Sequence, residues 1–198
     1  VVHDDWDALG MRASGSHSVS FEEVQLPLSA LRGGFPIGDA VEYMERNLAA
    51  GLFHAAAGLG IAESAHLSAA AGLARRDDLD PHAQMLAAES FVDLSASRAV
   101  FSRVAALIDE HHERNPTSRG TAQELTQLFA EAQGAKLFIG EAAVRIVDRA
   151  LAQSGGAGYL NGSPLARAYR DVRALPFMHP LGANRAYAFL GQLAAGRE

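Results

Sequence analysis

The stretch of residues 153–173 offers the most distinctive chemistry in the chain; it reads QSGGAGYLNGSPLARAYRDVR. Its glycine pair, Gly155 and Gly156, precedes a run of regularly spaced arginines. Glycines allow a backbone to approach a diphosphate closely and leave its N–H donors unobstructed by a side chain. Glycine is also the usual residue just past the end of a helix, so a simple helix cap is an equal alternative. The stretch therefore predicts either an anionic-cofactor site at helix ends or a helix terminus.

A second candidate is His179, which lies between Met178 and Pro180 in the turn ALPFMHPLGANRA. An imidazole that titrates near neutrality can donate a hydrogen bond to a bound group or act as a base. A histidine that caps the final helix or packs beside Phe177 is the structural alternative. No acidic residue lies between Asp171 and Glu198, so this turn carries no carboxylate base.

The other histidines favour structural roles. His111 and His112 are adjacent on a predicted helix and diverge too far to chelate one metal ion, so we interpret them as a solvated helix end. His54 lies in an apolar stretch and is predicted to be a core histidine, or else to line the active-site side of the bundle. Because the chain has no cysteine, thiolate nucleophiles and cysteine-bound metals are excluded, and we predict no metal site.

Helical periodicity positions these residues. One apolar stripe runs from about Asp39 to Leu73 and predicts a single long helix. Two further helices have clear starts, at Asp80–Pro81 and at the capping-box pair Thr121 and Glu124, and the first of the two ends before Glu113. A short helix is predicted from Ser163–Pro164 and a last one at about 181–195. The predicted inward residues are Val41, Met44, Leu48, Leu52, Ala55, Leu59 and Ala62; Phe91, Leu94, Phe101, Val104, Ala105 and Ile108; and Leu125, Leu128, Phe129, Ala132, Ile139, Ala143, Ile146, Val147 and Leu151.

The chain is predicted to have two parts that divide near residue 36. In residues 1–36, His17, Val19 and Phe21 alternate with serines, which is typical of one or two β-strands. In residues 37–198, three long helices and a broken fourth predict an up-and-down four-helix bundle. The predicted fold class is therefore mainly α, with a short β segment before the bundle.

Composition limits the function classes. The formal net charge of −6 argues against nucleic-acid binding, and no stretch has the length and hydropathy of a membrane span. We therefore expect a cytoplasmic protein that binds neither nucleic acid nor membrane. The sequence opens with VVHDDWD, without methionine, which we interpret as part of a longer protein.

Two separated motifs carry a family resemblance. The stretch WDALGMRASGSHSVSFEEVQLP resembles the end of the middle β-domain of acyl-CoA dehydrogenase-like flavoproteins, and QSGGAGY with RAYRDVR resembles the last bundle helices of that family. The resemblance covers the C-terminal half of such a protein. It implies a remnant of the β-domain in residues 1–36, a C-terminal bundle in residues 37–198, and a chain that is inactive without the missing half.

The resemblance also implies a flavin site shared between subunits. In the family, the glycine pair lies against the ADP part of the neighbouring subunit's FAD, so Gly155 and Gly156 are implied contacts. Family members place a glutamine three residues before the pair. Here that position is Ala152, and Gln153, one residue later, is the implied contact. The family's arginine at the end of the first bundle helix implies Arg76 as a further contact, although the phenylalanine and glycine that usually follow it are missing here. An exposed helix-end arginine paired with Asp77 or Asp78 is the structural alternative. The expected assembly is a homotetramer, a dimer of dimers.

The resemblance leaves three functions open. The main expectation is an FAD-dependent oxidoreductase (FMN is the alternative cofactor) that acts on an acyl-CoA or another small organic substrate. The first alternative is a two-component monooxygenase of the same fold, which uses reduced flavin and O2 and in which a histidine in the His179 turn stabilises a flavin C4a-hydroperoxide. The second is a non-catalytic assembly subunit or degenerate paralogue. The carboxylate base of the dehydrogenases is missing from the matching turn and from NLAAGLFHAAAGLG, where some relatives carry it.

Overall fold

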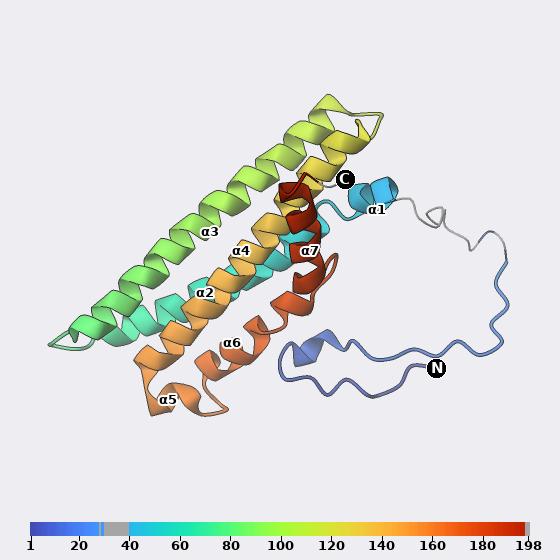
Figure 1. Cartoon of the computed structure of the whole chain (residues 1–198). Helices are drawn as coiled ribbons and strands as arrows, with labels where there is room; N and C mark the ends of the chain where they lie inside the picture. Colours follow the sequence, from blue (N-terminus) through green and yellow to red (C-terminus); the bar gives the residue numbers. More distant parts are fainter. Residues whose placement is uncertain (28, 30–39, 197–198) are drawn as a thin grey trace.

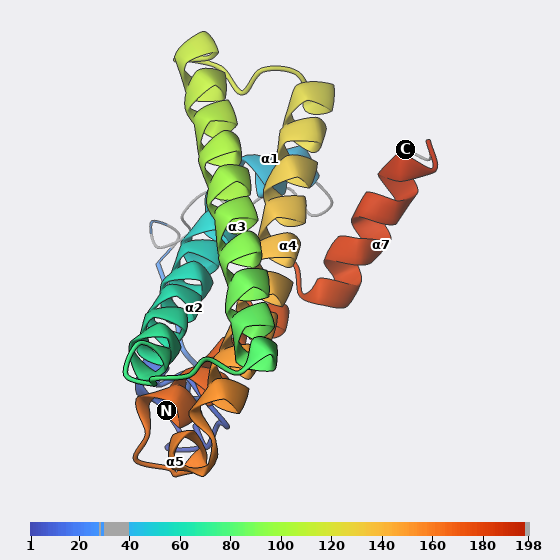
Figure 2. The same ribbon diagram turned by 90° about the vertical axis from the view of Figure 1, so that its left-hand side faces the viewer.

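The computed structural model describes residues 1–27, 29 and 40–196, and in this part of the chain helices dominate (Figure 1). Three long helices, α2 (Ala50–Leu73), α3 (Pro81–Arg114) and α4 (Ala122–Ser154), run side by side in alternating directions (Figures 1 and 2). The fourth position of the bundle holds a broken run of α6 (Pro164–Val172), the 3-10 turn η3 (Leu175–Phe177) and α7 (Ala183–Ala194). The predicted four-helix bundle is confirmed.

Local capping sets the helix starts. Asp80 accepts a hydrogen bond from the His82 backbone N–H, and Pro81 occupies the first turn of α3. Thr121 and Glu124 form a reciprocal capping box at the start of α4, as their spacing predicts. Ser163 accepts from the Leu165 N–H at the start of α6. Each of these starts was predicted from the sequence, because these caps join residues only two or three positions apart.

The predicted first helix is wrong in one respect, because it is broken. Helix α1 (Ala40–Arg46) ends before Asn47, and α2 begins at Ala50. The Asn47 side-chain amide donates to the Tyr43 carbonyl at 2.8 Å, so a side chain competes with the backbone for that acceptor. This break places Asn47 beside the His179 turn.

Helix α4 is the centre of the core. Its buried face includes Leu125, Phe129, Ile139, Ile146 and Val147, all at 2% exposure or less. It contacts α2 and α3 along its length, and α1, α6 and α7 pack against it. The small residues of α2, among them Gly51, Ala55 and Ala62, are buried and allow close approach of the helices.

The buried face of α3 differs from the predicted one. Phe91 was predicted to face the core but is 64% exposed, whereas its neighbour Ser90 is buried. The inward residues follow the spacing of a heptad and include two serines, at positions 90 and 97. Because serine is polar, a hydropathy pattern does not identify this face of α3 as buried. His111 is also buried, not solvated as predicted, because the 115–121 connection covers it: Asn115 bonds to its carbonyl at 3.0 Å and Gly120 lies against its ring.

The N-terminal segment has no strand within residues 1–27, although strands were predicted there. Val2 and Val19 form an isolated antiparallel bridge, supported by a 2.9 Å bond from the His3 N–H to the Ser18 carbonyl. A two-stranded pairing is marginal alone, and Val19 and Phe21 are exposed on it. A one-turn helix, η1 (Arg12–Ser14), forms the bend of this segment. The predicted boundary at residue 36 lies outside the described residues.

Two further observations bear on the predicted exclusions. No single helix in the described ranges has the length and hydropathy of a membrane span, although α1 and α2, bent by 40°, pass a test of length and composition as a pair. In residues 1–27, 29 and 40–196, no three side chains of His, Cys, Asp or Glu gather as a metal site would require.

Candidate functional site

His179 lies in the connection between η3 and α7, followed by a cis peptide bond to Pro180. Its ring Nε2 is hydrogen-bonded to Asn47 Oδ1. Because the Asn47 amide nitrogen already donates to the Tyr43 carbonyl, the oxygen of that amide must face His179 and can only accept. His179 Nε2 therefore carries a proton. In the neutral ring Nδ1 is then the acceptor, and it makes no hydrogen bond to the part of the chain that the structure describes.

Tyr43 also supports this turn. Its hydroxyl donates to the Pro180 carbonyl at 2.8 Å, and its ring meets that of His179 edge-on with centroids 6.3 Å apart. Burial raises the pKa of Tyr43, so the phenol remains a donor at neutral pH. The histidine is thus exposed but held from α1 and from the break after it.

Lys136 lies beneath the same turn and was not singled out from the sequence. Its side chain is 6% exposed, and its Nζ donates to the carbonyls of Met178 and, at 2.7 Å, of Leu181. Burial lowers the pKa of Lys136 to about 8. It is the only lysine in a sequence whose other sixteen lysine-or-arginine positions are all arginine. That imbalance is the signal that could have identified it.

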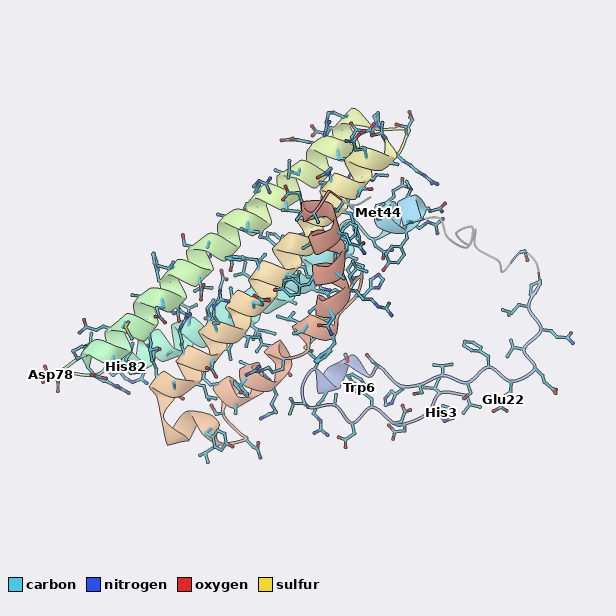
Figure 3. All side chains as sticks on the ribbon, in the orientation of Figure 1. His3, Trp6, Glu22, Met44, Asp78 and His82 are labelled. Atoms are coloured by element: carbon cyan, nitrogen blue, oxygen red, sulfur yellow. The ribbon has the colours of Figure 1, made fainter. Side chains whose placement is uncertain are left out.

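A cleft of about 580 Å³ lies between the N-terminal segment and the α6–η3 region. The bend of the segment, where Trp6 is labelled in Figure 3, forms one wall. The described residues that line the cleft include no Asp or Glu; among them are Trp6, Leu9, Met11, His54, Arg170, Arg173, Phe177 and Met178.

The segment is held against the bundle at one tight contact. The Met11 N–H donates to Asp171 Oδ1 at 2.6 Å. Gly10 is buried directly against the backbone of Arg170 and Asp171, where no side chain would fit. The W-x-x-L-G-M-R and R-D motifs therefore meet across 160 residues of sequence. Gly10, Met11 and Arg170 from this contact also line the cleft.

His54, which the sequence placed in the core or on the active-site side of the bundle, lies half-buried on α2 in the wall of this cleft. Its pKa is lowered, chiefly by burial and further by the positive charge of Lys136 and by His179. His54 is therefore neutral at pH 7 and can accept a proton.

His179 itself borders a second, more open hollow of about 550 Å³, together with Arg185 and Asn184. Phe177, which is 85% exposed, lines both the cleft and this hollow. The two spaces are thus neighbours on one face of the bundle.

The four predicted cofactor contacts lie together at the far end of α4. Arg76 Nη2 donates to the Gln153 carbonyl at 3.3 Å, and the Gln153 side chain donates to the Ala83 carbonyl at 2.9 Å. Gly155 follows directly with φ 62° and ψ −158°, a conformation open essentially to glycine alone. No described atom lies within 4 Å of where a Cβ would stand on Gly155 or Gly156. These residues form an open turn that a partner or ligand can approach.

The turn that contains Gly155 and Gly156, here called the glycine turn, is far from the His179 turn within one chain. At about 1.5 Å per residue, the part of α4 from Lys136 to Gln153 is about 25 Å long. The structure therefore brings Arg76, Gln153, Gly155 and Gly156 together but leaves His179 in a separate cluster.

Comparison with known proteins now identifies the family. The model of the acyl-CoA dehydrogenase C-terminal domain matches residues 41–184. The chain belongs to the acyl-CoA dehydrogenase family. The predicted resemblance is confirmed, and the segment that precedes this C-terminal domain packs on it through Gly10 and Met11.

Individual relatives of this acyl-CoA dehydrogenase family member include proteins named for more specific activities. The amino sugar nitrososynthase DnmZ of Streptomyces peucetius is 33% identical over all of this chain and 48% of its own length. The structure of KijD3 in complex with FMN and dTDP-3-amino-2,3,6-trideoxy-4-keto-3-methyl-D-glucose matches with a TM-score of 0.91 and 31% identity, over all of this chain and 49% of that one. A putative acyl-CoA dehydrogenase, YdbM of Bacillus subtilis (strain 168), is 29% identical over 87% of this chain and 44% of its own length. The chain thus spans about half the length of these relatives.

Proposed function

We propose that the whole protein is a flavin-dependent monooxygenase that oxidises the amino group of a nucleotide-linked amino sugar. Similarity to DnmZ and KijD3 over the full length of the chain supports this reaction class. It corresponds to the first alternative from the sequence. The comparisons favour that alternative over the acyl-CoA dehydrogenase expectation, which the match to YdbM supports more weakly.

The single observation that carries the proposal is the state of His179. The family's dehydrogenases place a carboxylate base in the matching turn. Here the turn holds an imidazole whose Nε2 proton is directed to Asn47, which leaves Nδ1 as a hydrogen-bonding atom. With Nδ1 as its free acceptor, the neutral imidazole can accept a hydrogen bond from an O–H group and keep that proton near the oxygen atom during transfer.

The flavin is FMN or FAD in this proposal, since KijD3 was described with FMN. The residues fit such a group, because open space lies beside Gly155 and Gly156 and the Arg76 guanidinium donates to the carbonyl of Gln153, two residues before Gly155. Arg76, Gln153 and the two backbone N–H groups would hold its phosphate-bearing part. When bound and reduced, a flavin supplies the electrons that activate O2. With about 25 Å between the glycine turn and the His179 turn, we infer that each chain contributes to two flavin sites in a homo-oligomer.

The cleft is suited to an anionic substrate. Arg170 and Arg173 line it, and no described Asp or Glu opposes them. Guanidinium groups pair well with diphosphate oxygens, and Trp6 offers a flat apolar surface for a base or sugar. His54, held neutral by burial, can accept the proton that an ammonium group must lose before its nitrogen becomes a nucleophile.

The test uses the full-length protein with a flavin reductase, NADH, FMN and O2, and a dTDP-linked 3-amino sugar as substrate. We expect a product that gains oxygen on nitrogen, observed by mass spectrometry. In parallel, the flavin-loaded protein is mixed with acyl-CoA without oxygen. Bleaching of the flavin absorbance there, without an oxygenated amino sugar in the first arm, would refute the proposal in favour of a dehydrogenase. Failure in both arms would favour a non-catalytic subunit.

A further inference from the structure

The side chain of Lys136 bridges the two sides of the His179–Pro180 step. Its amine donates to the carbonyl of Met178, immediately before His179, and to that of Leu181, immediately after Pro180. His179 and Pro180 lie between Met178 and Leu181. One buried atom therefore holds the backbone on both sides of the imidazole.

The packing and hydrogen-bond acceptors around Lys136 suit a lysine better than an arginine. Its stem passes Gly51 on α2, where a Cβ would stand 3.7 Å from Lys136 Cδ. An ammonium is compact and has three N–H donors at one point, whereas a guanidinium is a broad planar fork. In a chain that uses arginine at every other such position, lysine stands where two carbonyls converge on one buried atom.

We propose that Lys136 is a positioning residue for His179 in the reaction proposed above, on which this inference rests. Lys136 holds the turn from below, Asn47 orients the ring from the helix break, and Tyr43 fixes the Pro180 carbonyl. Lys136 does not touch the reacting atoms. It acts through the backbone on either side of the imidazole.

Protonation of Lys136 does not change this role. Burial lowers its pKa to about 8, so the amine is partly neutral in mildly alkaline solution. A neutral amine still has two N–H donors, which equals the number of carbonyls that it holds. The two hydrogen bonds from Lys136, here called the clamp, therefore persist on both sides of that pH.

The test compares four variants of the full-length protein. Lys136→Met keeps a similar length without any donor, and Lys136→Gln keeps two donors on a shorter side chain. His179→Gln removes the imidazole itself and serves to assign its signals. Arg103→Met is the matched control, because it removes a surface cation on α3 that pairs at 2.7 Å with Glu131 on α4, the helix of Lys136, and does not contact the turn.

The first measurement is independent of activity. Histidines are labelled with 13C at Cε1, and the His179 resonance is followed by NMR through a pH titration. We expect Lys136→Met to shift or broaden this resonance and to change its titration midpoint, with Lys136→Gln intermediate and Arg103→Met equal to the parent. A folded Lys136→Met protein with the parent's His179 titration would overturn the inference. Loss of the fold in both Lys136 variants would also overturn it, since Lys136 would then support the core and not the turn.

The second measurement is catalytic. A displacement of a reacting group by about 1 Å can cost on the order of 10²-fold in rate, so we expect kcat of Lys136→Met to fall by roughly that factor toward the His179→Gln value. KM for the amino sugar should stay within about two-fold, because Lys136 is not among the described residues that line the cleft and reaches it through the Met178 backbone carbonyl. A rise in KM with kcat unchanged would contradict the positioning role. If the parent forms no product, the proposed function fails, while the NMR measurement still decides whether Lys136 positions His179.

Discussion

The contact at Gly10 gives the sharpest quantitative prediction. Substitution Gly10→Ala adds one methyl group at the point where the N-terminal segment meets α6. Its Cβ would stand 2.7 Å from the Asp171 nitrogen and closer still to the Arg170 carbonyl, whereas Cβ atoms essentially never approach other atoms within 3.0 Å. The obstructing atoms are backbone, so no side-chain rotation can relieve the clash. The segment must move away from α6.

The size of the effect follows from the hydrogen bond beside it. A displacement of about 1 Å would stretch the 2.6 Å bond from the Met11 N–H to Asp171 beyond hydrogen-bonding distance. Loss of a hydrogen bond to a charged group costs about 1.5–3 kcal/mol. A middle value of about 2 kcal/mol corresponds to a roughly thirty-fold weaker attachment of the segment, since about 1.4 kcal/mol is ten-fold.

Hydrogen exchange at the Met11 amide measures this attachment directly. In the full-length protein, mass spectrometry of the peptide that contains Met11 should show protection lower by about thirty-fold, because protection follows the local opening equilibrium. The matched control is Gly134→Ala on α4, where no described atom lies within 4 Å of the new methyl group. That variant should gain about 0.5–1 kcal/mol of stability and leave Met11 protection unchanged. Parent-like protection of Met11 in a folded Gly10→Ala protein would refute the reasoning.

Three further predictions concern stability, each measured as the free energy of unfolding in urea. Gly155→Ala should cost about 1–3 kcal/mol because φ 62° with ψ −158° suits glycine alone, whereas Gly156→Ala should stay within about 0.5 kcal/mol; equal losses would contradict this. Hydrogen bonding, chiefly from Arg145, holds the pKa of Asp93 below its usual value, so the stability it adds is present above the unfolded pKa of about 3.9 and is lost as pH falls through the folded pKa. Asp93→Asn should thus cost about 1–2 kcal/mol at pH 7 and progressively less in acid, and a pH-independent loss would exclude this cause. Thr121→Ala should cost about 1 kcal/mol by removing the capping box of α4, and an unchanged free energy would show that the cap is dispensable.

Much of the fold could be predicted because its signals are local. The caps at Asp80, Thr121 and Ser163 each depend on a few neighbouring residues, and all three begin helices in the structure. The break after α1 could not be predicted in the same way. Asparagine disfavours helix interiors only weakly, and the Asn47 side chain here combines a local bond to the Tyr43 carbonyl with a bond to His179, which lies 132 positions away.

The residues of the candidate site also divide into those with a local sequence signal and those whose role depends on distant parts of the chain. His179 was found because its turn matches a family motif, and the glycine turn because glycine pairs are conspicuous. Lys136 was missed because a lysine between apolar residues of an amphipathic helix looks like an ordinary surface position. His54 was assigned first to the core, because a helical stripe does not reveal that a distant N-terminal segment turns its edge into a cleft.

The break in the first helix is best understood as part of the site and not as a defect of the bundle. At the end of α1 the Tyr43 carbonyl accepts from the Asn47 backbone N–H at 3.2 Å and from the Asn47 side-chain amide at 2.8 Å. Because Tyr43 also accepts from the Asn47 amide nitrogen, the oxygen of that amide is committed to the imidazole, and the proton of His179 is committed to Nε2. The same side chain that competes with the helix thus selects the tautomer of the histidine. A chemical property of the site, which ring nitrogen is left as the acceptor, is therefore set by where a helix ends.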